Sequence, residues 1–337
     1  MKQSFLFFVF SAAFPFVADA DLLSLHPLAA AETLLVNQDY RAAKKAVDGC
    51  LAKGEEENKA LYLRIAIEQT ELLDYESYHV HSERFLCVAD SILKVFEGRL
   101  AGLKGKDSTQ CLFYIANIYG GMSVIKAKMG KWLPAIRNSL TSVGLLKEVV
   151  QRDPALSAAM LGIGAFHYYL RKSFAWLPFV DENSEQRGIQ EIERATSAPF
   201  PYRFAAKNTL CWILIDQEQF DRADSVALSA LEETPGSTIF LRIRCCIALW
   251  SGRYERALEL GQELSEVSLL RDPVNWSDYV LAYYVLAGSY ERLGKIKEAL
   301  ACIRHILGTQ IPPASREIPP VRKNLKRILE IKKRCMQ

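Results

Sequence analysis

The sequence lacks most of the patterns that mark β-sheets, metal sites and redox centres. No run of alternating polar and β-branched residues is closed by a tight turn, so strand hairpins are not indicated. The 337 residues include only 5 histidines, and the 8 cysteines form no CxxC pair. A zinc knuckle and a thioredoxin-type redox pair are therefore not expected. These absences favour an all-α protein without a metal site.

Signatures of catalysis and of nucleic-acid binding are also missing. No GxSxG, HExxH or Cys–His motif occurs. Residues 105–108, GKDS, match a phosphate-binding loop only in part, because Leu100 stands where a glycine is required. The net charge of +3 is too small to mark a nucleic-acid-binding surface. We therefore predict that the protein is not an enzyme, holds no cofactor and binds no nucleic acid.

The N-terminus carries an apolar run that has no counterpart later in the chain. Lys2 precedes the apolar residues 5–17, and Ala18 and Ala20 supply small side chains where signal peptidase cleaves. The run is short for a membrane span, so residues 1–20 are interpreted as a signal peptide, with an uncleaved anchor as the alternative. An exported protein of the bacterial periplasm or cell envelope is expected. Most cysteines sit singly on apolar helix faces, which favours buried thiols with one or two disulfides possible.

Helical periodicity dominates the rest of the chain. About fifteen helical segments are separated by short breaks that carry Gly, Pro, Asp or Asn. In five of the breaks, an aromatic or aliphatic residue is followed three positions later by alanine. These pairs are Tyr40 and Ala43, Trp132 and Ala135, Phe220 and Ala223, Tyr254 and Ala257, and Ile296 and Ala299.

Ala223 and Ala257 are 34 residues apart, and at this point the sequence resembles the tetratricopeptide repeat (TPR) family. The resemblance is strongest over residues 201–308 and degenerate over 21–200. It implies an all-α, right-handed superhelical solenoid of about seven helix hairpins over residues 21–310. The residues that match the family's small and large positions in order are Leu286, Ala287, Tyr290, Gly294, Ile296, Ala299, Ile303 and Ile306.

Residues 311–337 are expected to form a stiff Pro-rich linker followed by a capping helix. Val321, Leu325, Ile328 and Leu329 make one apolar face, which suits the polar-backed terminal helix that a solenoid needs. From Arg316 onward the net charge is +6. A solvated capping face is the favoured interpretation, and contact with an acidic partner or a membrane surface is the alternative.

The TPR resemblance implies binding along the concave side, which the first helix of each hairpin lines. A protein or peptide segment is the expected ligand, since aromatic and hydrogen-bonding side chains suit such a groove. The alternative is that the tryptophans pack inside a tight superhelix. The positions carried over are Asn208, Trp212 and Asp216; Arg242, Cys246 and Trp250; Tyr284, Glu291 and Arg292; and, in an earlier helix, Asn117 and Lys128.

Residues 174–192, FAWLPFVDENSEQRGIQEI, are expected to contain a long link between two helices, near Ser173 to Glu182, and the start of the second helix. Asn183 with Gln186 predicts a capping box at the start of the second helix. Trp176 and Phe179 are expected to fold over the helix pair, and Arg187 to bridge to the acidic residue at 181. The alternative makes Trp176, Phe179 and Arg187 a binding site, and a further one makes residues 166–179 an apolar pocket of a small-molecule or lipid carrier.

Two glycine motifs frame this link. Gly162 and Gly164 lie inside a helical segment and are interpreted as a close helix contact or a kink. Gly164 with Phe166, Leu177-Pro178 and Arg187-Gly188-Ile189 are similar to a stretch of the eukaryotic inclusion-body clearance TPR family. That family's function is not carried over, because a signal peptide is foreign to it.

Overall fold

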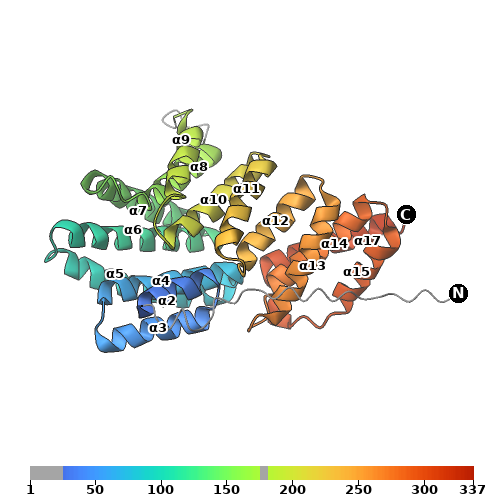
Figure 1. Cartoon of the computed structure of the whole chain (residues 1–337), viewed down its shortest axis with the longest axis horizontal. Helices are drawn as coiled ribbons and strands as arrows, with labels where there is room; N and C mark the ends of the chain where they lie inside the picture. The colour runs from blue at the N-terminus through green and yellow to red at the C-terminus, as the bar shows by residue number, and fades with distance from the viewer. Residues whose placement is uncertain (1–25, 175–180) are drawn as a thin grey trace.

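The computed structural model describes residues 26–174 and 181–337, and this part of the chain holds sixteen helices and no strand (Figure 1). The all-α prediction is confirmed. The helices are α2 (Pro27–Val36), α3 (Tyr40–Lys53), α4 (Glu57–Asp74), α5 (Tyr78–Leu100), α6 (Gly105–Lys128), α7 (Trp132–Arg152), α8 (Ala159–Phe174), α9 (Ser184–Ala195), α10 (Tyr202–Asp216), α11 (Phe220–Glu233), α12 (Thr238–Trp250), α13 (Tyr254–Leu270), α14 (Trp276–Arg292), α15 (Ile296–Gly308), α16 (Pro313–Arg316) and α17 (Pro319–Cys335).

Consecutive helices pack in pairs, which gives seven hairpins from α2–α3 to α14–α15. The first helices of neighbouring hairpins also contact one another along the whole series from α2 to α14, so these helices line the inner side. Helix α17 packs on α14 and α15 and ends the stack. The predicted TPR-like solenoid of about seven hairpins with a capping helix is thereby confirmed. The expected linker is only partly extended, because it contains the short helix α16.

Six of the seven hairpins turn in the same way. Each turn contains three consecutive residues: the first adopts a positive φ, the second is the N-cap of the next helix, and the third is the aromatic or aliphatic residue that begins this helix. Glycine adopts a positive φ without strain, whereas other residues do so at some cost. The residues with positive φ in these turns are Gln38, Glu76, Gly130, Glu218, Gly252 and Gly294.

The α4–α5 turn is one that the repeated sequence phrase did not reveal. Tyr78 begins α5 and is buried, as the aromatic residue of the phrase should be. Three positions later, however, stands the exposed His81, and the small buried residue is Ser82. In the five recognised turns the alanine is buried against the preceding helix, so the repeat is degenerate here in sequence and regular in structure.

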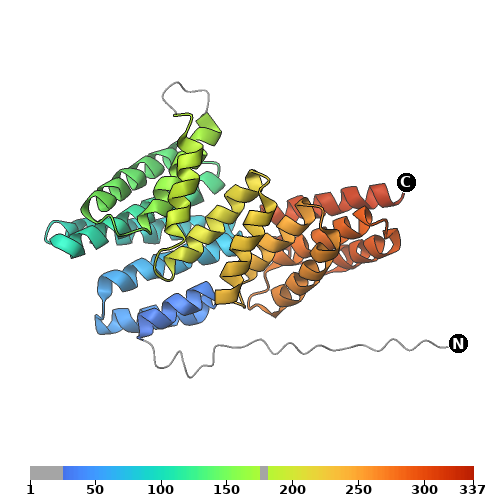
Figure 2. The ribbon, with the colours of Figure 1, turned by 45° about the horizontal axis from the view of Figure 1, so that its top comes forward.

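The α8–α9 hairpin is built on a direct contact between two backbones. A Cβ atom added to Gly164 would lie 2.6 Å from the carbonyl oxygen of Gly188, and a Cβ added to Gly188 would lie 2.6 Å from that of Gly164. The interpretation of Gly164 as a close helix contact is therefore confirmed. Figure 2 shows this hairpin projecting from one side of the stack.

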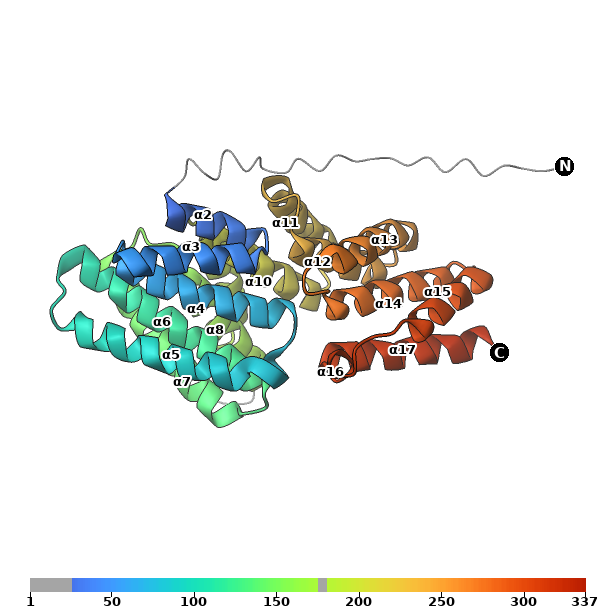
Figure 3. The same cartoon turned by 90° about the horizontal axis from the view of Figure 1, so that it is seen from below.

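The solenoid curves so tightly that its first two hairpins meet the fifth, sixth and seventh. Val36 packs against the apolar core of α10–α12, and the rings of Tyr62 on α4 and Tyr202 on α10 have centroids 6.4 Å apart. The side-chain carbonyl of Gln38 accepts a hydrogen bond from the backbone N–H of Thr238 at 2.7 Å. Figure 3 shows α2–α4 meeting α12 and α14 at the middle of the molecule. The inner side is therefore partly filled by the protein itself.

Most of the cysteines are buried thiols, the state that the sequence interpretation favours. All eight are free thiols, and five of them are buried. Burial raises the pKa of Cys211 to about 12 and also raises the pKa of Cys50. In the described residues the thiols serve as small apolar side chains, and no disulfide joins them.

Candidate functional site

The structure places Arg242, the predicted groove residue on α12, in a buried ionic network. Its guanidinium lies 2.8 Å from Asp278 Oδ1 on α14 and 3.5 Å from Asp74 Oδ1 on α4. Arg271, in the α13–α14 connection, lies 2.6 Å from Asp74 Oδ2. Both carboxylates are fully buried. We call Asp74, Arg242, Arg271 and Asp278 the closure cluster.

Neutral side chains from both ends of the chain complete the closure cluster. Asp74 Oδ2 accepts hydrogen bonds from the Gln38 amide at 2.7 Å and from the Tyr40 hydroxyl at 2.9 Å. The amide of Asn275 donates to the backbone carbonyl of Asp74 at 3.3 Å. With two acidic and two basic groups in contact, the charge is balanced. Arg242 therefore holds the ends of the superhelix together and is not a free side chain of a groove.

The stability of the closure cluster is expected to depend on pH through Asp278. Burial raises the pKa of this carboxyl, the adjacent Arg242 opposes the shift, and Asp74 and Arg271 also face it. A pKa that folding raises gives stability that is complete below the unfolded pKa and is lost as the pH rises through the folded pKa. The free energy of unfolding of the wild type should therefore fall relative to Asp278→Asn between about pH 4 and 7. Urea unfolding followed by circular dichroism measures this difference, and a constant or rising difference would contradict it.

An aromatic surface remains open where the inner helices α8, α10 and α12 end. The rings of Trp212 and Trp250 have centroids 6.4 Å apart, and Trp250 is 43% exposed whereas Trp212 is half-buried. Tyr169, near the end of α8, is half exposed, and partial burial, followed by the charge of Asp216 on α10, raises its pKa. We call Tyr169, Trp212 and Trp250 the inner aromatic site.

The other predicted positions on α10 and α12 are bonded to neighbouring side chains or buried. Asp216 lies 2.8 Å from Lys172 Nζ and accepts a hydrogen bond from the Tyr168 hydroxyl at 2.5 Å. The bond from Lys172, followed by that from Tyr168, lowers the pKa of Asp216. Cys246 is buried. The side-chain oxygen of Asn208 is also buried and has no hydrogen-bond partner among the described residues.

The capping helix covers the predicted groove positions on α14. The Arg327 guanidinium lies over the ring of Tyr284, 5.2 Å from its centroid. Arg334 forms two hydrogen bonds with the carboxylate of Glu291, at 2.5 and 2.8 Å. Arg292 remains exposed. Of the three predicted positions on α14, only Arg292 is therefore open to a ligand.

The two earlier positions carried over from the TPR resemblance also have partners. The amide of Asn117 donates to the backbone carbonyl of Phe113 at 2.7 Å. Lys128 lies 3.4 Å from the carboxylate of Glu76. Asn117 is thus bonded within its own helix, whereas the exposed Lys128 pairs with the α4–α5 turn.

Part of the 174–192 stretch departs from expectation. Trp176 and Phe179 lie outside the described residues. Asn183 is the N-cap residue of α9, as predicted, but its side chain makes no capping hydrogen bond, so the capping box is wrong. Arg187 does lie 3.7 Å from Asp181, with both side chains half exposed. An exposed pair of this kind contributes at most about 1 kcal/mol, so it anchors the link only weakly.

A cleft of about 330 Å³ lies between α7, α8 and α9, beside Arg187. His167 and Glu191 line it, with 2.6 Å between His167 Nδ1 and the carboxylate. Lys147, Gln151 and Met160 also line it, so the lining mixes charged, polar and apolar groups. This cleft lacks the closed apolar lining that the carrier alternative requires.

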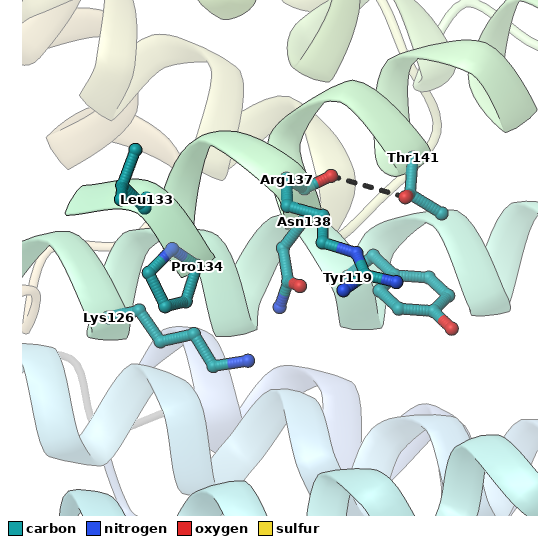
Figure 4. Close-up of a pocket in the computed structure, with 7 residues that line it drawn as sticks. All are labelled: Tyr119, Lys126, Leu133, Pro134, Arg137, Asn138 and Thr141. Carbon is teal, nitrogen blue, oxygen red and sulfur yellow. Dashed lines mark hydrogen bonds between the residues drawn. The ribbon is translucent and has the colours of Figure 1, made fainter. Parts of the chain in front are cut away.

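A larger cavity, of about 490 Å³, lies between α6 and α7 (Figure 4). The sequence interpretation missed it, although a signal was present: residues 108–147 contain no acidic residue. The exposed Trp132 and Leu133 at the start of α7 were read only as part of the repeat phrase. The cavity is lined by Tyr119, Lys126, Leu133, Pro134, Arg137, Asn138 and Thr141.

Metal and membrane sites were searched for across the described ranges, 26–174 and 181–337. Within them, no group of three or more His, Cys, Asp or Glu side chains is placed to hold a metal ion. Likewise, none of the helices there is long and apolar enough to cross a membrane.

Comparison with known proteins gives distant structural similarities. No protein-family model and no curated protein matches the chain. Among solved structures, the C-terminal part of a TPR repeat-containing protein from Cytophaga hutchinsonii is 17% identical, with a TM-score of 0.43, over 87% of this chain and 99% of that one. A tetratricopeptide repeat protein from Parabacteroides merdae is 9% identical, with a TM-score of 0.40, over 90% and 97%. Yeast Tom70 is 9% identical, with a TM-score of 0.35, over 91% and 89%.

These scores are low, so the solenoid fold rests on the helix packing described above. The short resemblance to the inclusion-body clearance family finds no support in the comparisons.

Proposed function

We propose that the protein is an interaction scaffold that binds a peptide or protein segment at the inner aromatic site. The observation that carries this proposal is the pair formed by Trp212 and the exposed Trp250 on neighbouring inner helices. Aromatic rings offer a large contact area with little loss of conformational entropy, and tryptophan is enriched at the centres of protein interfaces. Tyr169 extends the same surface, and the Lys172–Asp216 ion pair at its edge offers polar contacts.

Export and location at the cell envelope are part of the same proposal. They rest on the apolar run and the small residues within positions 1–20, which lie outside the described part of the chain. A partner in the periplasm or on the envelope surface would fit a scaffold delivered by such a signal. Detection of the chain lacking its first twenty residues in a periplasmic fraction is the direct test.

Replacing Trp250 with alanine is expected to reduce partner recovery about tenfold, because hot-spot tryptophans typically contribute more than 1 kcal/mol to binding. Pull-downs from envelope fractions, quantified by mass spectrometry, compare the wild type with Trp250→Ala. The matched control is Leu270→Ala, which removes an 84% exposed side chain from α13. Equal recovery of every partner by wild type and Trp250→Ala would contradict the proposed site.

Arg242→Glu is not a suitable probe of this surface. It would bury a third carboxylate beside Asp74 and Asp278, so a loss of binding would report unfolding. Thermal melting of Trp250→Ala close to that of the wild type is needed before its binding result is interpreted.

A further inference from the structure

The outer side of α7 exposes a stripe of apolar side chains. Trp132 is 65% exposed, and Ile136 and Leu140 follow it at intervals of four residues on the same helix face. The stripe extends over about 12 Å of the helix axis. Leu133, 82% exposed, stands beside it. A row of large apolar side chains of this kind on one helix marks an interaction surface rather than scattered surface residues.

The cavity between α6 and α7 opens on the next face of α7, with Leu133 at its edge, and has room for a side chain of a partner (Figure 4). Leu133, Pro134 and Arg137 line it from α7, and Lys126 lines it from α6. Asn138, more than nine-tenths buried, also lines it, and its side-chain nitrogen has no hydrogen-bond partner among the described residues. An unpaired buried donor is costly, so an acceptor entering the cavity would relieve that cost.

The charged residues of the α6–α7 segment over 108–147 are all basic. The α6–α7 segment from residue 108 to residue 147 contains five Lys and Arg residues and no Asp or Glu. Two of the five have acidic partners, since Lys128 lies near Glu76 and Lys131 lies 2.9 Å from Glu83. The other three, Lys126, Arg137 and Lys147, form no ion pair with any described residue.

We propose that this surface, the α7 stripe with its adjacent cavity, docks an amphipathic α-helix of a partner protein whose apolar face is bordered by Asp and Glu. The apolar stripe suits the helix face, the cavity takes one protruding side chain, and Lys126 and Arg137 face the acidic border. Carboxylates would also supply the acceptor that Asn138 lacks. This surface is separate from the inner aromatic site, so an experiment can disprove binding at one of them without bearing on the other.

Two other occupants fit less well. An anionic membrane presents a flat layer of headgroups, with no protruding side chain to enter the cavity between α6 and α7. A second copy docking through the same face would bring Lys126 and Arg137 against their own counterparts, since a two-fold contact pairs identical surfaces. The cavity and the unpaired basic residues together therefore favour an acidic helix over both.

The test is a display library of 18-residue amphipathic helices with a fixed leucine stripe and with Asp, Glu, Lys, Arg or Ser allowed at the flanking positions. Peptides are selected on the wild-type protein and counter-selected on Leu133→Glu. We expect the surviving peptides to be enriched in Asp and Glu. One of them should then bind Leu133→Glu and Arg137→Glu at least about tenfold more weakly than the wild type, measured by fluorescence anisotropy.

Matched controls separate this surface from general effects of charge. Leu270→Glu alters an equally exposed leucine on α13, and Lys297→Glu reverses an exposed lysine on α15; both should bind the peptide like the wild type. Trp250→Ala should also bind it unchanged. Circular dichroism checks that each variant is folded. If Leu133→Glu does not fold, Leu140→Glu replaces it as the variant of the stripe.

Several results would overturn the proposal. One is a selection that yields no peptide able to distinguish wild type from Leu133→Glu, or one enriched in basic flanks. Another is binding to vesicles rich in phosphatidylglycerol that Leu133→Glu abolishes, with no selected peptide, which would assign the surface to lipid. A third is self-association in sedimentation that Leu133→Glu abolishes, again with no selected peptide, which would assign it to a second copy.

Discussion

Asp74→Ala is expected to lower the free energy of unfolding by about 3–5 kcal/mol, the usual cost of removing one partner from a buried ionic network. The fully buried Asp74 carboxylate faces the guanidiniums of Arg242 and Arg271 and accepts hydrogen bonds from Gln38 and Tyr40. Its removal leaves Arg271 without its carboxylate partner and the Tyr40 hydroxyl without its acceptor. The Gln38 amide, by contrast, keeps its bond to Thr238. Urea unfolding followed by circular dichroism at neutral pH measures the loss.

The chain offers a matched control at the same junction. Arg41 and Asp272 also join the first hairpin to the α13–α14 connection, at 2.7 Å, but both side chains are largely exposed. Asp272→Ala should therefore change the free energy of unfolding by less than about 1 kcal/mol. If Asp74→Ala costs no more than this control, the closure cluster does not hold the ends of the solenoid together.

Gly188→Ala is expected to destabilise the protein by about 2–3 kcal/mol or more, because the new methyl group meets backbone rather than flexible side chains. Its Cβ would lie 2.6 Å from the carbonyl oxygen of Gly164 and 2.8 Å from the backbone nitrogen of Tyr168. Neither atom can move unless α8 shifts away from α9. Thermal melting should show a lower Tm, and hydrogen exchange should show protection lost first in α8 and α9.

Gly144→Ala provides the opposite expectation within the same fold. Gly144 lies inside α7, where an added Cβ meets nothing within 4 Å. Alanine favours the helix there by about 0.5–1 kcal/mol, so the Tm should rise slightly. If the two substitutions changed the Tm equally, Gly188 would not be required for the close packing of α8 on α9.

The sequence predicted the hairpins well because each is encoded locally. An aromatic residue at a helix start and an alanine one turn later, as in Tyr254 and Ala257, determine a turn and a close crossing within a few residues. The same logic explains the turn that was missed, since α5 replaces the alanine with Ser82 in a shifted position. Gly164 was interpreted correctly because a glycine inside an apolar helical segment already suggests a close contact.

The candidate site was less predictable because it depends on contacts between distant residues. The repeat register indicates that Arg242 faces inward, but it does not indicate that Asp74, 168 residues earlier, fills the space in front of it. Capping by α17 hides Tyr284 and Glu291 in the same way. By contrast, Trp250 lies beyond these contacts at the end of α12 and is exposed, which the binding interpretation requires.

The closure cluster also affects how the chain can fold as it is made. In a simple solenoid each repeat needs only its neighbours, so hairpins can form in order as they are synthesised. Asp74 must instead wait for Arg242 and Asn275, 168 and 201 residues later, before both hydrogen bonds to its backbone carbonyl can form. At typical synthesis rates this interval lasts about 10–40 seconds. During it the first hairpins present a carboxylate that lacks its arginine partners, and until α12 is made they also expose Val36. A binding partner or chaperone would therefore have its best access to this end of the protein before the last third emerges.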